Sequence, residues 1–464
     1  MSRMEQLLDH ITAVTYDDLS AEAVVACKTF VLDSLGVGVS GSRVPFVEQL
    51  LTVAQQQWSG AGAAHVWNSG VSLSPSSAAL VNAYQIHNQE FDCVHEAAVV
   101  HPMAVILSTL LAWSEQLAAG GRQVDGRALI SALSVAVDVA TVIGMCASQP
   151  MRFFRPGICG GLGAVAGMAR LSGFDRGLTQ QALGIFYSQM GGTMQAHQEG
   201  SETLPMQIAF NARNAVVAIE LAQAGLTAPL NILDGDFGLF SLFEDAGNAD
   251  TAFAQLGKIE QITRVSHKPY PTGRAAHGGL DGIAQLRASM GFSVEQIDSI
   301  VISAPPLIRR LVDRPPTDSM NHNYAKLCMG YIAATFLLTG DMTVEDYQEQ
   351  ALRDPERLAL ADKVRMQPNN IDDPNALAPQ SVEIRLLDGR SQRLELPAVL
   401  GSPERALSRE QHLKKFRQCY QSGAQSLSVT TMEQLIVDVD QLEGCADVSA
   451  LIALTRTAQS QTER

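Results

Sequence analysis

The chain is poor in clustered cysteine: none of its seven cysteines belongs to a C-x-x-C pair. The number is odd and the positions are widely scattered, so we expect reduced thiols. Iron–sulfur and structural zinc sites need thiolates at close ligand spacing, which this sequence does not offer. The cysteine pattern therefore argues against a metal held by thiolates.

Basic residues are also scarce, since 33 Lys and Arg stand against 48 Asp and Glu and the formal net charge is −15. A nucleic-acid partner would require a contiguous basic face, and the sequence shows none. If the substrate is an anion, a few local cations must recruit it.

Long apolar segments are few. The N-terminus has no apolar core of a secretory signal and soon meets Asp17 and Asp18, so we expect a cytoplasmic protein. The longest apolar run, residues 128–147, carries Asp138 near its middle and has no basic flank after it. We therefore expect a buried helix there and no membrane partner.

Several common motifs are missing. No G-x-S-x-G elbow or P-loop occurs. His95-Glu96 and His101 resemble the zincin motif, but histidines six apart lie about 240° apart around a helix and cannot share a face. Gly161, Gly163 and Gly167 lack the spacing and the preceding strand of a dinucleotide loop, so close helix packing explains them better.

What the chain does contain is helical periodicity. Its 464 residues, 46% of them hydrophobic, suffice for a large core and two unequal domains. Ser20 precedes a helical pattern that Gly36 is expected to end, and Ser74-Pro75 predicts an N-cap and a first helical position. Without intervening strands, helices are predicted over residues 78–87, 104–117, 128–147, 160–171 and 211–224.

The pattern changes near residue 260. Ser293 and Gln296 form a capping box, residues 299–303 indicate a strand, and residues 381–387 and 391–396 flank an Asp388-Gly389 turn as a hairpin. Two further helices are predicted to start at Ser408 and Thr431. The sequence thus predicts a mainly α protein: a large all-helical domain from both termini (1–265 and 398–464) with a smaller inserted α+β lid domain (266–397).

Two polar segments interrupt the apolar helices. Residues 90–102 bring two carboxylates and two imidazoles into a turn, and residues 267–277 form a Pro- and Gly-shaped loop with cations. By composition alone the first segment is as well explained by a polar loop between helices, and the second is better explained by a solvated linker.

Together these segments resemble the MmgE/PrpD family, which includes 2-methylcitrate dehydratase, cis-aconitate decarboxylase and iminodisuccinate epimerase. The resemblance runs over nearly the whole chain and rests on several marks in the same order. These are Phe91-Asp92 with His101-Pro102, residues 160–175, Ala212-Arg213-Asn214, residues 267–271 with His277, Ala325-Lys326 with Tyr331 and Gly340, and residues 400–403 before Lys415-Phe416.

The resemblance implies a cleft between a helical domain and a lid, a homodimer, and chemistry without a metal or organic cofactor. It also implies a carbanion formed beside a carboxylate. His101 matches the family's catalytic histidine and would carry the proton. The other implied catalytic residues are Lys268, Asp92 and Tyr331. The implied substrate-binding residues are Glu90, Arg155, Gln207, Arg274 and His277, of which His277 could merely support its loop.

The chain also departs from the family pattern. Glu90 replaces an aspartate, Val94 a threonine, Leu204 a lysine, Gln207 a histidine and Arg155 a pocket histidine. Because Arg155 offers a planar fork to a carboxylate while Leu204 and Val94 are apolar, we expect a mono- or dicarboxylate with an apolar portion.

Three functions remain open at the level of sequence. The first is a lyase that dehydrates or decarboxylates a small carboxylic acid. The second is an epimerase or isomerase that returns the proton to the same kind of anion. The third is a non-catalytic carboxylate-binding homologue, because one lysine of the family site is replaced by Leu204.

Overall fold

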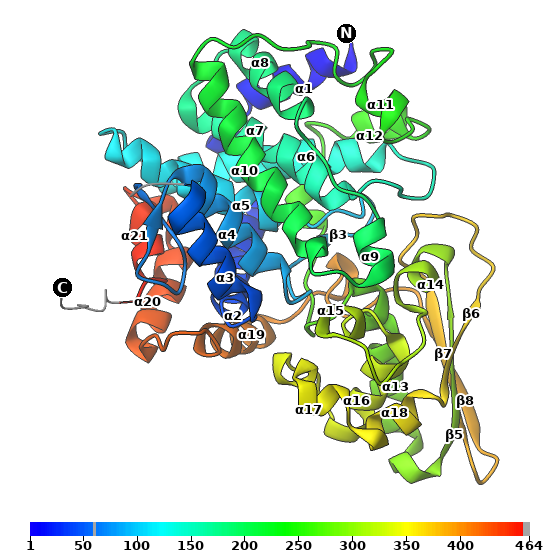
Figure 1. The fold of residues 1–464 in the computed structure, drawn as a ribbon. Helices are drawn as coiled ribbons and strands as arrows, with labels where there is room; N and C mark the ends of the chain where they lie inside the picture. The colour runs from blue at the N-terminus through cyan, green and yellow to red at the C-terminus, as the bar shows by residue number, and fades with distance from the viewer. Residues whose placement is uncertain (59–61, 458–464) are drawn as a thin grey trace.

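The computed structural model describes residues 1–58 and 62–457 and shows a mainly helical protein, which confirms the predicted fold class (Figure 1). The first part of the chain builds one large body of packed helices. Its helices are α1 (Arg3–Ala13), α2 (Ala21–Gly41), α3 (Phe46–Val53), α4 (Pro75–His87), α5 (Pro102–Ala119), α6 (Gly126–Met145), α7 (Arg155–Ser172), α8 (Arg176–Tyr187), α9 (Gln195–Glu199), α10 (Thr203–Gln223), α11 (Leu239–Leu242) and α12 (Ala249–Phe253).

The lid forms a separate α+β layer, seen at the lower right of Figure 1. Its sheet has the order β6-β5-β7-β8; β5 and β6 are parallel, whereas β5–β7 and β7–β8 are antiparallel. Helix α13 packs on β7 and β8. The strands are β5 (Ile297–Ala304), β6 (Val364–Pro368), β7 (Gln380–Leu386) and β8 (Ser391–Leu396), and the helices are α13 (His277–Met290), α14 (Pro306–Val312), α15 (His322–Ala325), α16 (Met329–Thr339), α17 (Glu349–Leu352) and α18 (Pro355–Ala361).

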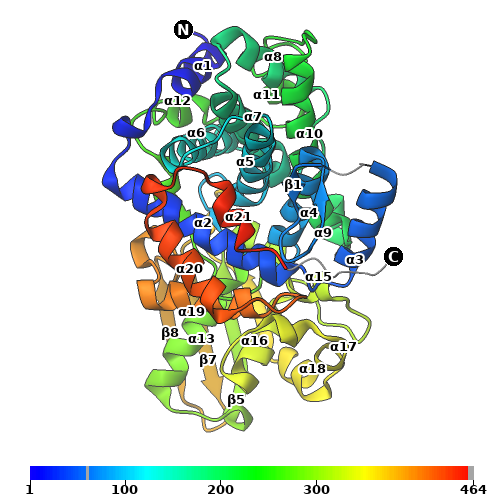
Figure 2. The same cartoon turned by 90° about the vertical axis from the view of Figure 1, so that its left-hand side faces the viewer.

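After the lid the chain returns to the helical body. Helices α19 (Arg409–Gln421) and α20 (Val429–Asp440) pack on α2, and α21 (Ser449–Ala453) packs on α5 (Figure 2). The capping boxes at Ser293 and Ser408 and the hairpin β7–β8 are confirmed. The proposed boundaries at 265/266 and 397/398 stay a prediction.

Helices α2 and α6 are long and apolar enough to cross a membrane, but 72% and 89% of their most apolar windows are buried inside the protein. Asp138 in α6 is satisfied there, because its carboxylate accepts from the Gln261 N–H at 2.7 Å and lies 3.0 Å from His10 Nε2. Burial with satisfied polar groups is typical of core helices.

The glycines of α7 serve close packing, as predicted. A Cβ at Gly163 would collide with the Ala136 carbonyl of α6, and one at Gly161 with the Phe186 ring of α8. A side chain at either position would push neighbouring helices apart.

Three local predictions were wrong. Helix α2 continues past Gly36 to Gly41, because burial against the Phe416 ring outweighs the low helix propensity of glycine. Helix α20 starts at Val429 with Ser428 as its N-cap, so Thr431 is its third residue. Short strands do interrupt the helical body: β1 (Ala64–His65), β2 (Ser72–Leu73), β3 (Val94–His95) and β4 (Val265–Ser266).

Candidate active site

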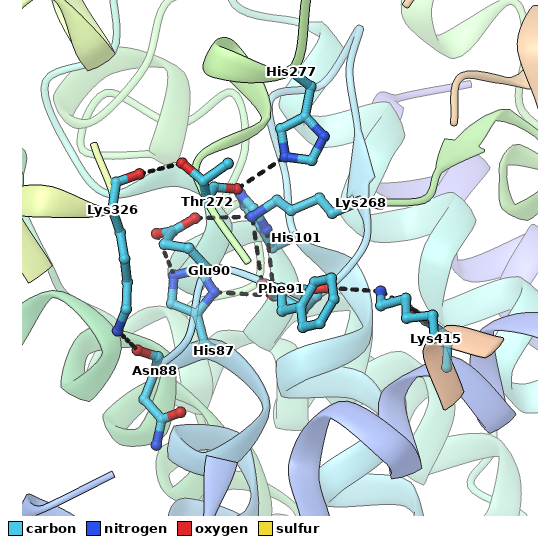
Figure 3. Close-up of polar contacts among 12 residues, drawn as sticks. His87, Asn88, Glu90, Phe91, His101, Lys268, Thr272, His277, Lys326 and Lys415 are labelled. Atoms are coloured by element: carbon cyan, nitrogen blue, oxygen red, sulfur yellow. Dashed lines mark hydrogen bonds and ion pairs between the residues drawn. The ribbon is translucent and has the colours of Figure 1, made fainter. Parts of the chain in front are cut away.

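The pairing of β3 with β4 brings the two polar segments together. Val94 lies opposite Ser266 and His95 opposite Val265, in antiparallel register. Each strand has only two residues, but the pair joins positions about 170 residues apart in sequence. Consequently the segment that begins at Glu90 lies beside the loop that carries Lys268 (Figure 3).

Asp92 is the centre of the resulting cluster. One of its oxygens lies 3.0 Å from His87 Nδ1 and 3.3 Å from His101 Nδ1, and the other lies 3.7 Å from Lys268 Nζ. The Asp92 and Lys268 side chains are almost fully buried, whereas the His101 side chain keeps 14% exposure. His101 is therefore the most exposed member of this group.

Glu90 completes the cluster. Its carboxylate accepts a hydrogen bond from Lys268 Nζ at 2.8 Å and lies 3.8 Å from His87 Nε2. Glu90 has a φ of 53°, in the left-handed region that few non-glycine residues adopt. The strained backbone aims the carboxylate at Lys268.

The charges of the cluster follow from these contacts. Burial opposes ionisation of Glu90, but the Lys268 ammonium prevails and lowers the pKa of Glu90 to about 2. Burial opposes ionisation of Asp92 too, yet His87, His101 and Lys268 hold the pKa of Asp92 well below its usual range. Both carboxylates are thus ionised near neutral pH.

The two histidines differ. Burial lowers the pKa of His101 in spite of Asp92, which favours the neutral imidazole. Burial would also lower the pKa of His87, but the closer contact with Asp92 raises it above the ordinary value. The arrangement pairs a neutral, reachable imidazole with a buried one that more readily holds a proton.

Lys415 supports this cluster from α19. Its ammonium donates to the Phe91 carbonyl at 2.9 Å, lies 4.2 Å from the centre of the Phe91 ring and pairs with Asp33 of α2 at 2.8 Å. Phe91 lies between Glu90 and Asp92 in the sequence. The hydrogen bond from Lys415 to the Phe91 carbonyl therefore fixes the direction of both carboxylates (Figure 3). A residue near the C-terminus thus positions the first polar segment.

Replacing Lys415 by methionine is expected to lower the free energy of unfolding by about 3–5 kcal/mol, because Asp33 would be left buried without its counter-ion. Urea unfolding followed by tryptophan fluorescence measures the change. Lys414→Met, at the exposed neighbouring position, is the control and should change stability by less than about 0.5 kcal/mol. Equal stability of the two variants would contradict the role given to Lys415.

Arg155 and Arg274, two of the predicted substrate-binding residues, already form ion pairs within the protein. Arg155 pairs with Glu244 at 3.1 Å and donates to the Asn375 side chain of the lid at 3.3 Å. Arg274 pairs with Glu96 at 2.8 Å and donates to the Leu400 carbonyl at 2.7 Å. Each guanidinium group is thus already paired with an internal carboxylate, and the substrate-binding role of both residues stays a prediction.

The other predicted site residues lie in supporting positions. His277 Nε2 lies 3.2 Å from the Thr272 carbonyl, and Gln207 accepts from the Thr193 N–H at 2.6 Å. Tyr331 is fully buried and its hydroxyl donates to the Asp346 carbonyl, so its role at the site stays a prediction. A different tyrosine, Tyr347, lies between Tyr331 and Lys326, with its ring centre 5.7 Å from Lys326 Nζ.

Sequence reasoning missed three residues of this region. The sequence places His87 only at the end of a predicted helix, although it begins the polar stretch that contains Asp92. Lys326 and Lys415 stand in the sequence only as marks of the family resemblance. The polar stretch was the available signal for His87, whereas no local pattern distinguishes a buried lysine from an exposed one.

Two groups of described residues have the composition of a metal site: His87 with Asp92 and His101, and Asp33 with His267 and His412. In each group the possible ligand atoms lie within 4.8 Å of one another. A lysine ammonium lies against the carboxylate of each group, at 3.7 Å from Asp92 and 2.8 Å from Asp33. Its positive charge opposes a divalent cation at the same carboxylate.

Comparison with known proteins identifies the family of the chain. Residues 5–252 match the MmgE/PrpD N-terminal domain and residues 270–440 the MmgE/PrpD C-terminal domain. Mouse cis-aconitate decarboxylase is 28% identical over 451 residues, which cover 94% of this chain and 90% of the mouse protein. The Aspergillus terreus enzyme of the same name is 27% identical over 465 residues, covering 94% and 92%. The relatives are enzymes, and the chain belongs to the MmgE/PrpD family.

Proposed function

We propose that the protein is a lyase that acts on a small carboxylic acid through a carbanion next to a carboxylate, without a metal or organic cofactor. The observation that carries the proposal is the placement of His101. Its Nδ1 faces the ionised Asp92, its side chain is partly exposed, and burial favours its neutral form. A neutral imidazole oriented by a carboxylate is suited to take up one proton, and the imidazolium that results can deliver it again.

Asp92 supports both directions of proton transfer. As a neighbour of Nδ1 it orients the ring, which leaves Nε2 for the substrate, and it stabilises the imidazolium that forms when Nε2 takes a proton. In a dehydration His101 would remove a proton next to the carboxylate before hydroxide leaves. In a decarboxylation it would first have to hold a proton as imidazolium, which Asp92 stabilises, and would give that proton to the carbanion left by carbon dioxide.

The charge balance supports a substrate with few carboxylates. Lys268, Arg155 and Arg274 each lie within 3.1 Å of an internal carboxylate. A tricarboxylate would meet fewer free cations than the family resemblance implied and would approach the ionised Glu90. A monocarboxylate, or a dicarboxylate with an apolar portion, suits this site better.

Incubation with a panel of mono-, di- and tricarboxylates in deuterated buffer, followed by NMR, tests the proposal. We expect an alkene or a shortened acid from at least one member less charged than citrate. Exchange of a C–H without a product would replace the lyase by an epimerase. The absence of exchange, together with an unchanged thermal-shift response of His101→Ala to every ligand, would leave a non-catalytic carboxylate-binding protein.

We also propose that the protein acts as a homodimer, an assignment that rests on the family resemblance. Sedimentation velocity of the purified chain at micromolar concentration should give the mass of two copies. A monomer at that concentration would contradict the proposal.

A further inference from the structure

A cavity of about 310 Å³ opens between the helical body and the lid, and one of its lining residues, Gln89, directly precedes Glu90 of the cluster around Asp92. Its lining includes Arg43 and Gln89 of the helical body and Asn321, Lys326, Tyr347 and Arg353 of the lid. In Figure 2, α15 and α17 lie below α3, and the segment that leads into α3 contributes Arg43 to the lining. The volume suits a small organic acid.

Lys326 differs from the other buried lysines of the described chain. Lys268 and Lys415 each have a carboxylate at 2.8 Å. Lys326 is only 3% exposed, and its ammonium donates to the Asn88 carbonyl at 2.7 Å, without a carboxylate within 4.0 Å among the described residues. A buried ammonium with a neutral partner leaves its charge uncompensated.

The remaining charges of the cavity do not fill this role. Arg43 pairs with Glu345 at 2.7 Å and Arg353 with Glu349 at 3.1 Å. Burial lowers the pKa of His322, another lining residue, to about 3, so this imidazole is neutral. Lys326 is therefore the uncompensated cation among the lining residues that the structure describes.

Tyr347 supplies a second unsatisfied group on the same wall. It is 6% exposed, and its hydroxyl is buried without a hydrogen bond, although it approaches the Thr272 side chain. Its ring contacts the Lys326 ammonium, with 5.7 Å between Nζ and the ring centre. A hydroxyl donor beside an ammonium is a suitable pair for one carboxylate.

We propose that Lys326 and Tyr347 bind the carboxylate of the substrate in this cavity, and that Glu90 limits the substrate to one carboxylate on this side. Figure 3 shows Glu90 between Lys326 and Lys268. Lys268 is already occupied by Glu90 at 2.8 Å, so a second substrate carboxylate would meet a fixed negative charge there. This inference rests on the proposed function, because it names the substrate class of the same site.

The ionisation of Lys326 supports the proposal. Burial lowers its pKa to about 7, against the opposing charges of Glu90 and Glu202. A carboxylate bound to the ammonium would stabilise the charged form, so the pKa of Lys326 must rise when the ligand binds. Binding must also weaken above pH 7, where the free lysine loses its proton.

Titration of propionate, succinate and tricarballylate tests the proposal by thermal shift and calorimetry. We expect propionate to bind the wild-type protein more tightly than tricarballylate does. Lys326→Met should lower the affinity for propionate at least about tenfold, and Lys326→Arg should restore part of that affinity. Lys258→Met, at an exposed position, is the matched control and should bind as the wild type does. For the acid turned over, Lys326→Met should raise KM with little change in kcat.

A second readout does not depend on the folding of Lys326→Met. In protein labelled with ¹³C at the lysine Cε, with Lys326→Arg assigning the resonance, the pKa of Lys326 should rise on saturation with propionate. An unmoved titration, or unchanged propionate affinity in a folded Lys326→Met, would overturn the proposal. If His101→Asn abolishes turnover while Lys326→Met leaves KM unchanged, this inference fails and the proposed function stands. If the protein binds propionate only when Lys326 is present but turns over no acid, the proposed function fails and this inference stands.

Discussion

Replacing His101 by asparagine is expected to lower kcat by about 10²- to 10⁴-fold, because it removes the imidazole that exchanges a proton with the substrate. Asparagine is polar and smaller than histidine, so Asp92 keeps a possible donor nearby. The loss should therefore appear in kcat and kcat/KM, with little change in the thermal unfolding midpoint. Steady-state rates with the acid found by the carboxylate panel measure the effect.

His95→Asn is the matched control for this prediction. His95 lies in the same segment but is 1% exposed, and its Nε2 contacts the Gln261 side chain at 3.1 Å. It should cost stability while leaving kcat within a few fold. A His101→Asn variant with wild-type kcat would contradict the role of His101.

The pH dependence of the wild-type enzyme follows from the same residue. Because burial places the pKa of His101 below 6.5, the neutral form that acts as a base persists into mildly acid solution. In a reaction that starts with proton abstraction, kcat/KM should be flat near pH 7 and fall on the acid side of that pKa.

The second large effect concerns stability in acid. Burial lowers the pKa of five buried histidines outside the cluster: His95, His197 and His412 to about 4, His267 to about 3, and His277 well below its usual value. The unfolded chain binds protons at these imidazoles below about pH 6.5, whereas the folded protein does not. Their contribution to stability is therefore complete above pH 6.5 and is lost as the pH falls.

Between pH 6.5 and pH 5 each of these histidines should cost about 2 kcal/mol of unfolding free energy, and together they should cost on the order of 10 kcal/mol. Protonation of His87 has the opposite effect on the unfolding free energy, because the pKa of His87 is raised in the folded protein. Glu90, whose pKa is about 2 instead of 4.5, loses its contribution only below about pH 4.5, outside this interval. Urea unfolding at pH 7, 6 and 5 measures the dependence.

A single-site variant separates this cause from general acid sensitivity. His412→Gln removes one titrating imidazole, so its stability should depend on pH less steeply, by about 1.4 kcal/mol per pH unit. Stability that stays constant from pH 7 to pH 5, or an unchanged slope in His412→Gln, would contradict the assignment to buried histidines.

Much of the helical architecture could be predicted from local patterns. Ser74-Pro75 and the capping boxes at Ser293 and Ser408 begin helices where expected, because an N-cap acts through backbone groups only two or three residues away. Where the prediction failed at Gly36, the deciding contact was with Phe416, far along the chain. Propensity is a local quantity, and a distant packing partner overrides it.

For the candidate site, too, local sequence patterns predicted one part and contacts between distant residues decided the other. Sequence alone determined that the chain is mainly helical with an inserted α+β part, and that two polar segments stand out from the apolar helices. Only the tertiary structure decided which charges compensate one another: Glu90 and Asp92 pair with Lys268, and Glu244 pairs with Arg155. Among residues 1–58 and 62–457, no carboxylate lies within 4.0 Å of the Lys326 ammonium. The reason is that capping and periodicity act over a few residues, whereas the ionisation of a buried group depends on every charge within several ångströms, whatever its place in the chain.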